Sequence, residues 1–507
     1  MRIVLAAFAL AVLAGSGAGA QTPAPDAGPA ASPASRPVVR AHRDVSTADP
    51  NAQAAFDHGL TLLYAFNPEE ARRAFGEAAR LDPTLAMAQW GLAMSYGVNI
   101  NTSFDPGAQA HGREAIGRAH ALEPHASPVE RALIGAAARR FAYVRANQSA
   151  TSAKAYRDAM RTVAGEFAFD DDVQTLAAEA EMDVHPWSYF TADGRATPGT
   201  LEIIGRLHDV LARTPGHIGA NHYLIHAFEE SPHPEEALPA ATRLAALGFE
   251  PAAEHLAHMP AHAFMRAGAY GAAGDANARA VALYKTYLAG DPAGHGDYFG
   301  HDCVFGVDAY MMAGAYAAAR GIALECARNG GNMMPIVDFR FRRWASLANG
   351  ANASDFLGGM LLAHDGRFAL AQEHLRALRK SGDAVGTIQT ALLEAALARG
   401  AGKSDAEIAA LQHAVTVQDG FDYAEPPTFW YPVRETLGGA YFRAQRYADA
   451  ERTFRDDLAR NRENPRSLFG LAETLAREDR GDDERAVRER FARAWRQGDG
   501  ELDVRNL

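Results

Sequence analysis

The sequence predicts an all-α fold, a solenoid in which antiparallel helix hairpins stack into a right-handed superhelix. Helical periodicity runs through most of the 507 residues, and hardly any stretch shows the alternation of a β-strand. One spacing of small and aromatic residues also recurs three times. The composition is uniformly Ala-rich with no second linker, and a repeat array has no fixed size because each unit contacts only its neighbours. We therefore expect one TPR-like solenoid over residues 48–494 and a C-terminal tail over residues 495–507.

Two segments precede the solenoid. Residues 1–20 combine Arg2, a short apolar run and a small-residue ending, which is typical of a secretory signal peptide. The apolar run is too short to span a bilayer, so we expect no integral membrane segment after signal cleavage and a periplasmic or secreted chain. An uncleaved N-terminal anchor is the alternative. Residues 21–47 are rich in Pro, Ala and Ser and are predicted to form a disordered linker.

The repeat is clearest near the start of the solenoid. Gly59 is followed at fixed distances by Tyr64, Ala71, Phe75, Ala78 and Pro83. This is the tetratricopeptide spacing, in which small residues let two antiparallel helices approach and the proline ends the second one. Copies are readable at residues 357–375 and 437–454, whereas residues 106–190 and 197–327 stay helical but lose the consensus. The central units are therefore where we look for function.

Two histidine pairs stand out in these central units. His222 and His226 are four residues apart, and His258 and His262 repeat that spacing 36 positions later, close to one repeat length. Positions one repeat apart occupy equivalent places on neighbouring helices, so the four imidazoles are predicted to converge on one patch of the concave groove. His301, which lies 39 positions beyond His262, extends the series to a third hairpin.

This pattern predicts a transition-metal site. Glu229 shares a helix face with His222 and His226, and a pair of neutral imidazoles at i, i+4 can bind one Zn, Cu or Fe ion. Glu229 is then a ligand or a base, and Arg266 or Tyr431 contacts the substrate. Because the chain has 19 histidines, two alternatives stay open. One is a buried hydrogen-bonded network without a metal, and the other is a chance arrangement of solvated side chains.

Three other features have two readings each. Glu425 opens a Pro-rich aromatic stretch that either contacts a ligand or forms a packing corner. Arg340, Arg342 and Arg343, near Trp344, are suited to binding a carboxylate, although a solvated helix face explains them more simply. Cys303 and Cys326 either form a disulfide, as an exported chain allows, or remain buried thiols.

The formal net charge of -12 restricts the partners. No basic stripe compensates it, which disfavours nucleic acid and an anionic membrane surface. We therefore expect a small molecule or a peptide in the concave groove.

Three strings, NHYLIHAFEES, HMPAHAFMRAGAY and EPPTFWYPVRETLGGAYFRA, resemble a bacterial family of exported tetratricopeptide-repeat proteins, most of which lack an assigned activity. The resemblance covers nearly the whole mature chain. It implies a helical solenoid with a polar cluster that falls on His222, Tyr223, His226, Glu229, His258, Met259, Pro260 and His262. Members often carry Asn after the later histidine, whereas this chain has Asp302, which leaves the role of that position open.

Two functional hypotheses follow. The first is a metal-dependent enzyme, a hydrolase or an oxidoreductase, with a Cu, Zn or Fe ion in the groove. The second is a non-catalytic scaffold that binds a peptide or protein partner and whose histidines are structural. The resemblance names no reaction and does not decide between them.

Overall fold

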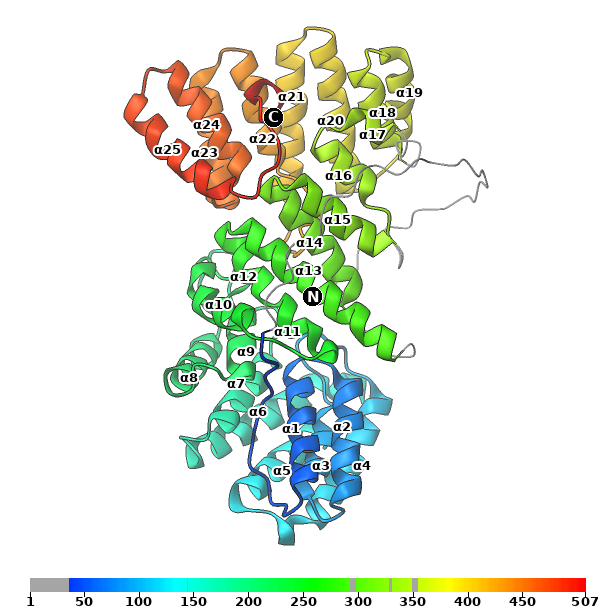
Figure 1. The fold of residues 1–507 in the computed structure, drawn as a ribbon, viewed down its shortest axis with the longest axis vertical. Coiled ribbons are helices and arrows are strands. Elements are labelled where there is room, and N and C mark those ends of the chain that lie inside the picture. Colours follow the sequence, from blue (N-terminus) through cyan, green and yellow to red (C-terminus); the bar gives the residue numbers. More distant parts are fainter. Residues whose placement is uncertain (1–35, 144, 292–297, 328–330, 349–353) are drawn as a thin grey trace.

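The computed structural model describes residues 36–507 except 144, 292–297, 328–330 and 349–353. The predicted signal peptide and the first part of the predicted linker lie outside the described residues. Figure 1 shows an elongated array of helices whose N-terminal and C-terminal hairpins lie at opposite ends. The described residues contain no β-strand and two isolated bridges. None of the described helices is both long and apolar enough to cross a bilayer.

The helices follow one another as antiparallel hairpins, which confirms the all-α, TPR-like solenoid class. The N-terminal part consists of α1 (Pro50–Tyr64), α2 (Pro68–Leu81), α3 (Ala86–Met94), α4 (Pro106–Ala121), α5 (Pro128–Arg140), α6 (Ser149–Glu166), α7 (Asp171–Met182) and α8 (Thr200–Arg213). The central part consists of α9 (Ile218–Phe228), α10 (Leu238–Ala246), α11 (Glu254–His258), α12 (Pro260–Ala267), α13 (Tyr270–Gly290), α14 (Phe299–Ala313) and α15 (Tyr316–Cys326).

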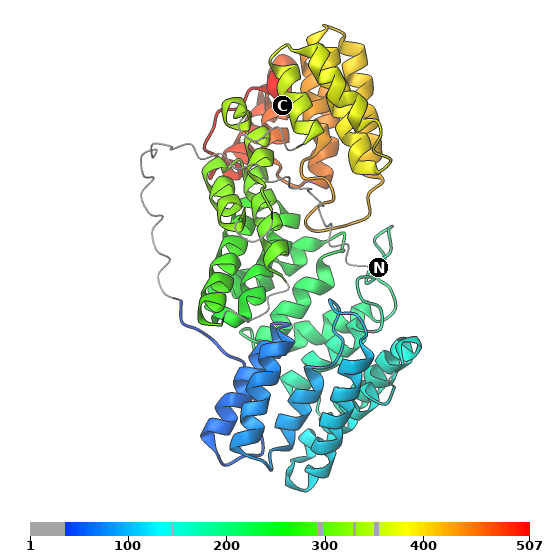
Figure 2. The ribbon, with the colours of Figure 1, turned by 90° about the vertical axis from the view of Figure 1, so that its right-hand side faces the viewer.

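The C-terminal part begins with short helices and ends in regular hairpins. It consists of α16 (Met334–Arg340), α17 (Trp344–Leu347), α18 (Asp355–His364), α19 (Phe368–Leu378), α20 (Ala384–Gly400), α21 (Ser404–Asp419), α22 (Val433–Arg443), α23 (Tyr447–Arg460), α24 (Pro465–Arg477) and α25 (Gly481–Ala494). A turn of 3-10 helix, η7 (Val504–Asn506), follows. Figure 2 shows the same progression along the long axis from a perpendicular direction.

Glycines at fixed repeat positions let the hairpins close around an aromatic ring. The ring of Phe75 fills the space that a Cβ atom on Gly59 of α1 or on Gly91 of α3 would occupy. Gly438 on α22 has the same relation to Phe454 on α23. A side chain at these glycines would collide with a rigid ring, so the first and last repeats owe their close helix packing to the same pair of residue types.

The helices at the centre of the array are enclosed by their neighbours. Every residue of α9 from Ile218 to Phe228 is buried, and so is every residue of α11. A helix that is buried all round normally carries apolar residues, because a buried polar group without a partner costs free energy. Here α9 and α11 carry four histidines between them, so these side chains require an explanation beyond packing.

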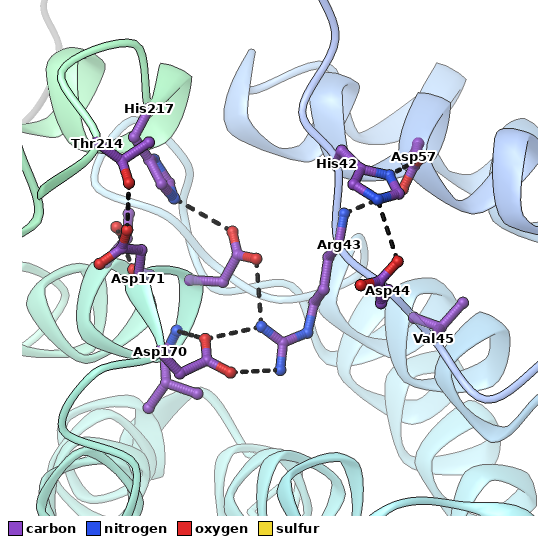
Figure 3. Close-up of polar contacts among 12 residues, drawn as sticks. His42, Arg43, Asp44, Val45, Asp57, Asp170, Asp171, Thr214 and His217 are labelled. Carbon is purple, nitrogen blue, oxygen red and sulfur yellow. Dashed lines mark hydrogen bonds and ion pairs between the residues drawn. The ribbon is translucent and has the colours of Figure 1, made fainter.

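Residues 36–47 lie along the N-terminal hairpins and make specific contacts, which their composition does not indicate. The amide of Val39 donates to the carbonyl of Gly248 at 3.0 Å. Arg43 is 8 % exposed, and its guanidinium binds Asp170 at 2.8 and 3.0 Å and Asp172 at 3.2 Å. Figure 3 shows Arg43 directed at Asp170. This part of the predicted linker is therefore held by a buried ion pair in the described structure.

We expect Arg43→Ala to lower the free energy of unfolding by about 3 kcal/mol at pH 7, because it leaves two carboxylates without their cation. Burial raises the pKa of Asp172, but the hydrogen bond from His217 and the charge of Arg43 outweigh it and leave the pKa below its usual 3.8. The pair thus stabilises the fold above about pH 4, and its contribution is lost as pH falls through the lowered pKa.

Urea titrations at pH 7 and pH 3 measure this effect. The difference in the free energy of unfolding between wild type and Arg43→Ala should be smaller at pH 3 than at pH 7. Arg40→Ala is the matched control in the same segment. Its partner Glu250 lies 3.1 Å away, but the Arg40 side chain is 49 % exposed, so about 0–1 kcal/mol is expected. Equal losses for the two variants would contradict the role given to Arg43.

The two cysteines form a disulfide. Cys303 on α14 is bonded to Cys326 on α15, so the bridge joins the two helices of one hairpin. Of the two alternatives that the sequence left open, the structure contains the bridge.

Candidate metal centre

Six histidines from α9, α11, α12 and α14 converge in the centre of the array. They form two groups of three, and within each group one ring nitrogen of every residue lies within 4.8 Å of the others. The first group is His222, His226 and His255, and the second is His258, His262 and His301. The structure thus brings together the five histidines predicted from spacing and adds His255, which spacing did not single out.

The sequence suggested that the cluster lies on the open surface of a concave groove. In the structure it lies in the core instead. The exposed fractions are 0 % for His222 and His258, 1 % for His226, 3 % for His255 and 5 % for His262. His301 is partly exposed. The groups adjoin, since ring centroids are 6.3 Å apart for His226 and His262 and 5.8 Å apart for His255 and His258.

The tautomers of two histidines are fixed by hydrogen bonds on the side away from the cluster. His222 Nδ1 lies 2.6 Å from the carbonyl oxygen of Tyr64, so this nitrogen carries the proton and donates it. His258 Nδ1 lies 2.6 Å from Asn277 Oδ1. Asn277 Nδ2 donates to the carbonyl of Ala273, which assigns Oδ1 as the acceptor. In both rings the Nε2 atom is therefore left with a lone pair.

The second group contains a direct contact between two imidazoles. Nε2 of His262 lies 2.8 Å from Nε2 of His258, and Nδ1 of His262 lies 2.6 Å from Glu425 Oε2. Because His258 Nε2 accepts, His262 Nε2–H donates. Burial lowers the pKa of His262, but Glu229 and Glu425 outweigh it and raise the pKa above its usual 6.5. A proton thus sits between two nitrogens that are close enough to share an ion.

The other five imidazoles are neutral near pH 7. Burial is the largest cause that lowers their pKa, and the charge of neighbouring imidazoles adds to it. The pKa lies well below 6.5 for His222, His226, His255 and His258, and falls to about 3 for His301. A neutral ring is the form that binds metals.

His255 completes the first group without a hydrogen bond of its own. Neither of its ring nitrogens has a hydrogen-bond partner in the described structure, although the residue is buried. Its ring stacks on the ring of Tyr298, with the two centroids 4.1 Å apart, and on that of Phe66, with the centroids 5.7 Å apart. Aromatic contacts therefore hold the ring, and both nitrogens remain available.

Three buried carboxyl groups surround the imidazoles. Glu229 Oε1 lies 2.8 Å from His226 Nδ1, without hydrogen-bond geometry, and 3.8 Å from His262 Nδ1. Asp302 Oδ1 lies 3.2 Å from His258 Nδ1. Burial raises the pKa of Glu229 to about 7 and also raises the pKa values of Asp302 and Glu425. A cation among the rings would stabilise the charged forms of these groups.

The other two residues predicted to act in the site lie in different places. Arg266 on α12 donates to the carbonyl of Ser231 at 2.9 Å and stacks over Tyr423 at 5.0 Å. Its charge lowers the pKa of Glu229, so it belongs to the surroundings of the centre. Tyr431 lies instead beside Arg340, whose guanidinium is 5.4 Å from its ring, in the C-terminal core.

Two contacts of the centre were beyond the reach of spacing arguments. Glu425, which the sequence left between a ligand contact and a packing corner, reaches His262 from a loop 163 positions away. No sequence pattern singles out Asn277 on α13, which binds His258. The one local signal that sequence reasoning could have used is His255, because it precedes His258 by three positions and so shares its helix face.

Comparisons with known proteins add little to this picture. No family model and no curated protein matches the chain. Yeast Tom70 is similar at 10 % identity and a TM-score of 0.27, covering 87 % of this chain and 92 % of that one. The human IFIT1 dimer with m7Gppp-AAAA is similar at 12 % identity and a TM-score of 0.32, covering 87 % and 90 %. At these TM-scores the likeness carries no argument about function.

Proposed function

We propose that this chain is a metalloprotein whose histidine cluster holds two transition-metal ions, one in each group of three. The observation that carries the proposal is a set of buried ring nitrogens without hydrogen-bond partners: Nε2 of His222, Nε2 of His226 and both nitrogens of His255. A hydrogen-bonded histidine network without a metal would pair these atoms, and solvated side chains would not be buried. Both alternatives left open by the sequence therefore fit the first group less well, whereas in the second group an ion would displace the proton between His258 and His262.

The contacts on the outer side of the rings support the same proposal. Metal-binding histidines usually donate their other N–H to a carbonyl or a carboxylate, which fixes the tautomer and the ring orientation. Tyr64 supplies a carbonyl to His222, and Asn277 supplies an amide oxygen to His258. Three imidazoles without a thiolate suit Zn, Cu or Fe and leave a further coordination position open.

We further propose that the centre serves a hydrolase or an oxidoreductase that acts on a small molecule. His301 is partly exposed, but a peptide cannot reach the five histidines that are 0–5 % exposed unless the helices separate. A bound ion would supply a Lewis acid or a redox centre. Glu229, with a pKa of about 7, can accept and return a proton near neutral pH, and Arg266 beside it can bind an anionic group.

Elemental analysis of untagged protein tests the proposal. We expect about two transition-metal ions per chain, lost when His226 and His262 are both replaced. Metal-free protein that still captures a partner would favour the scaffold function instead. The disulfide between Cys303 and Cys326 supports export to an oxidising compartment, so the preparation should come from the exported fraction.

We expect Glu425→Gln to weaken binding of the ion in the second group by about 10–100-fold, because the amide no longer holds His262 with a charge. Competition with a coloured chelator measures the two affinities separately. Glu123→Gln is the matched control, since Glu123 contacts a histidine, His120, at 2.8 Å on the surface. If Glu425→Gln and Glu123→Gln bind both ions equally tightly, Glu425 has no part in the centre.

A further inference from the structure

A cavity that is partly open to solvent lies in the C-terminal part, away from the histidine cluster. It is a cavity of about 470 Å³ between α16, α18, α20, α21, α22 and α24. Phe339, Trp344, Leu392 and Tyr431 contribute apolar or aromatic surface to its wall. Sites for small molecules typically occupy about 300–1,000 Å³ and combine such surface with a few convergent polar groups. The cavity therefore has the size and the lining of a ligand site.

Most of its charged side chains are arginines. Five of them line the cavity, together with two glutamates: Arg340, Arg342, Arg399, Arg443 and Arg466, and Glu407 and Glu435. Each glutamate is already paired, Glu435 with Arg340 at 2.6 and 2.8 Å and Glu407 with Arg443. Arg399 donates to the carbonyl of Arg505 and to Asn506. Three of the five arginines are thus left without a glutamate partner on the cavity wall, which Leu507 also lines.

Two of these arginines have no anionic partner in the described structure. Arg342 is exposed at the edge of the cavity, and its side chain makes neither a hydrogen bond nor an ion pair within the described residues. Arg466 is 6 % exposed, donates only to the carbonyl of Arg340 at 3.3 Å, and its Nε has no partner. Burial, followed by the charge of Arg340, lowers the pKa of Arg466 to about 9. Both guanidinium groups would be stabilised by an anion.

We infer that this cavity binds a small organic anion. Its carboxylate or phosphate group would pair with Arg342 and Arg466, and its apolar body would pack against Trp344 and Tyr431. A guanidinium binds either oxyanion through two parallel hydrogen bonds, so the shared chemistry is a planar or tetrahedral oxyanion on an apolar molecule. This inference is independent of the metal centre, and it gives Tyr431 a ligand contact at a different site from the one predicted.

Calorimetric titration of the full chain tests the inference with phenyl phosphate, phenylacetate, inorganic phosphate and the neutral benzyl alcohol. We expect one site for at least one aromatic anion and no binding of benzyl alcohol. Tighter binding of phenyl phosphate than of phenylacetate assigns a phosphate ligand, and the reverse assigns a carboxylate. Inorganic phosphate binding as tightly as phenyl phosphate would overturn the role of the apolar wall.

Two variants place the ligand in this cavity. Arg342→Gln should weaken binding by about tenfold or more, because a charge-assisted pair is lost. Ala396→Phe should weaken it as well, because Ala396 lines the cavity and the added ring fills it. Arg343→Gln is the matched control, since Arg343 is the next residue, stacks over Tyr316 at 4.8 Å and does not line the cavity.

Stability without ligand separates a binding role from a structural one. Arg342 has no partner to lose, so Arg342→Gln should leave the melting temperature unchanged or raise it, because like-charge repulsion is removed. The inference is overturned if no anion binds wild type at millimolar concentration, or if Arg342→Gln and Ala396→Phe bind as wild type does. It is also overturned if Arg342→Gln unfolds the protein, since Arg342 is then structural.

Discussion

The His222→Asn variant is expected to retain one transition-metal ion of the two that we propose for the wild type. His222 belongs to the first group of histidines, and its Nε2 is a buried lone pair without a partner. Asparagine keeps a polar group near the carbonyl of Tyr64 but removes that nitrogen. His301→Asn should likewise remove the ion of the second group only, and the double variant should contain none.

We therefore expect two ions per chain in the wild type, one in His222→Asn, one in His301→Asn and none in the double variant. Elemental analysis after dialysis against a weak chelator measures these numbers. The loss of an ion should also lower the melting temperature, because a ligand at about 1,000 times its Kd stabilises the folded state by about 4 kcal/mol. His120→Asn is the control, as that side chain is 71 % exposed and pairs with Glu123 at 2.8 Å on the surface. Two ions in every variant, or loss of both in each single variant, would contradict two separate sites.

The fold could be predicted from the sequence because its determinants are local. The offsets among Gly59, Phe75 and Pro83 specify one helix hairpin, and the structure places the Phe75 ring against the glycine as that spacing requires. The 36-residue shift between His222 and His258 also follows from the repeat, since it fixes equivalent positions on adjacent units. Periodicity therefore predicts which residues share a face and which faces lie next to each other.

Burial and long-range partners could not be predicted in the same way. The repeat predicts an open concave surface, but α9 and α11 are enclosed on all sides, which no spacing indicates. Glu425 reaches His262 through a loop whose path depends on how the C-terminal hairpins stack. Arg340 fits a solvated helix face in the sequence but is 7 % exposed and pairs with Glu435, whereas Arg342 is exposed as that interpretation predicts. Each of these outcomes depends on tertiary packing between distant segments.

Glu435→Ala is expected to lower the free energy of unfolding by about 3–5 kcal/mol at pH 7, because it leaves a buried cation unpaired. Side-chain exposure is 1 % for Glu435 and 6 % for Arg340, and the two form a bidentate pair at 2.6 and 2.8 Å. Glu435 also accepts a hydrogen bond from Asn464 at 2.8 Å. Glu394→Ala is the control, since its pair with Arg379 is exposed and is expected to contribute about 0–1 kcal/mol.

The pH dependence of this loss has a defined sign. Burial raises the pKa of Glu435, but Arg340 outweighs it and leaves the pKa below its usual 4.5. The carboxylate therefore stabilises the fold above about pH 4.5, and the stabilisation is lost as pH falls through the lowered pKa. Urea titrations should show that the difference in the free energy of unfolding between wild type and Glu435→Ala becomes smaller from pH 7 to pH 3. A gap that is constant with pH would indicate lost packing rather than lost charge.

The same variant links stability to the cavity. Without Glu435, Arg340 joins Arg342 and Arg466 as a cavity arginine with no carboxylate partner, so an added anion has more charge to neutralise. We expect phenyl phosphate to raise the melting temperature of Glu435→Ala by more than that of wild type, because only the variant regains a counter-charge for Arg340. The double variant Arg342→Gln, Glu435→Ala should show a smaller rise. Equal shifts in all three proteins would mean that the anion binds elsewhere and that Glu435 stabilises the fold through Arg340 and Asn464 alone.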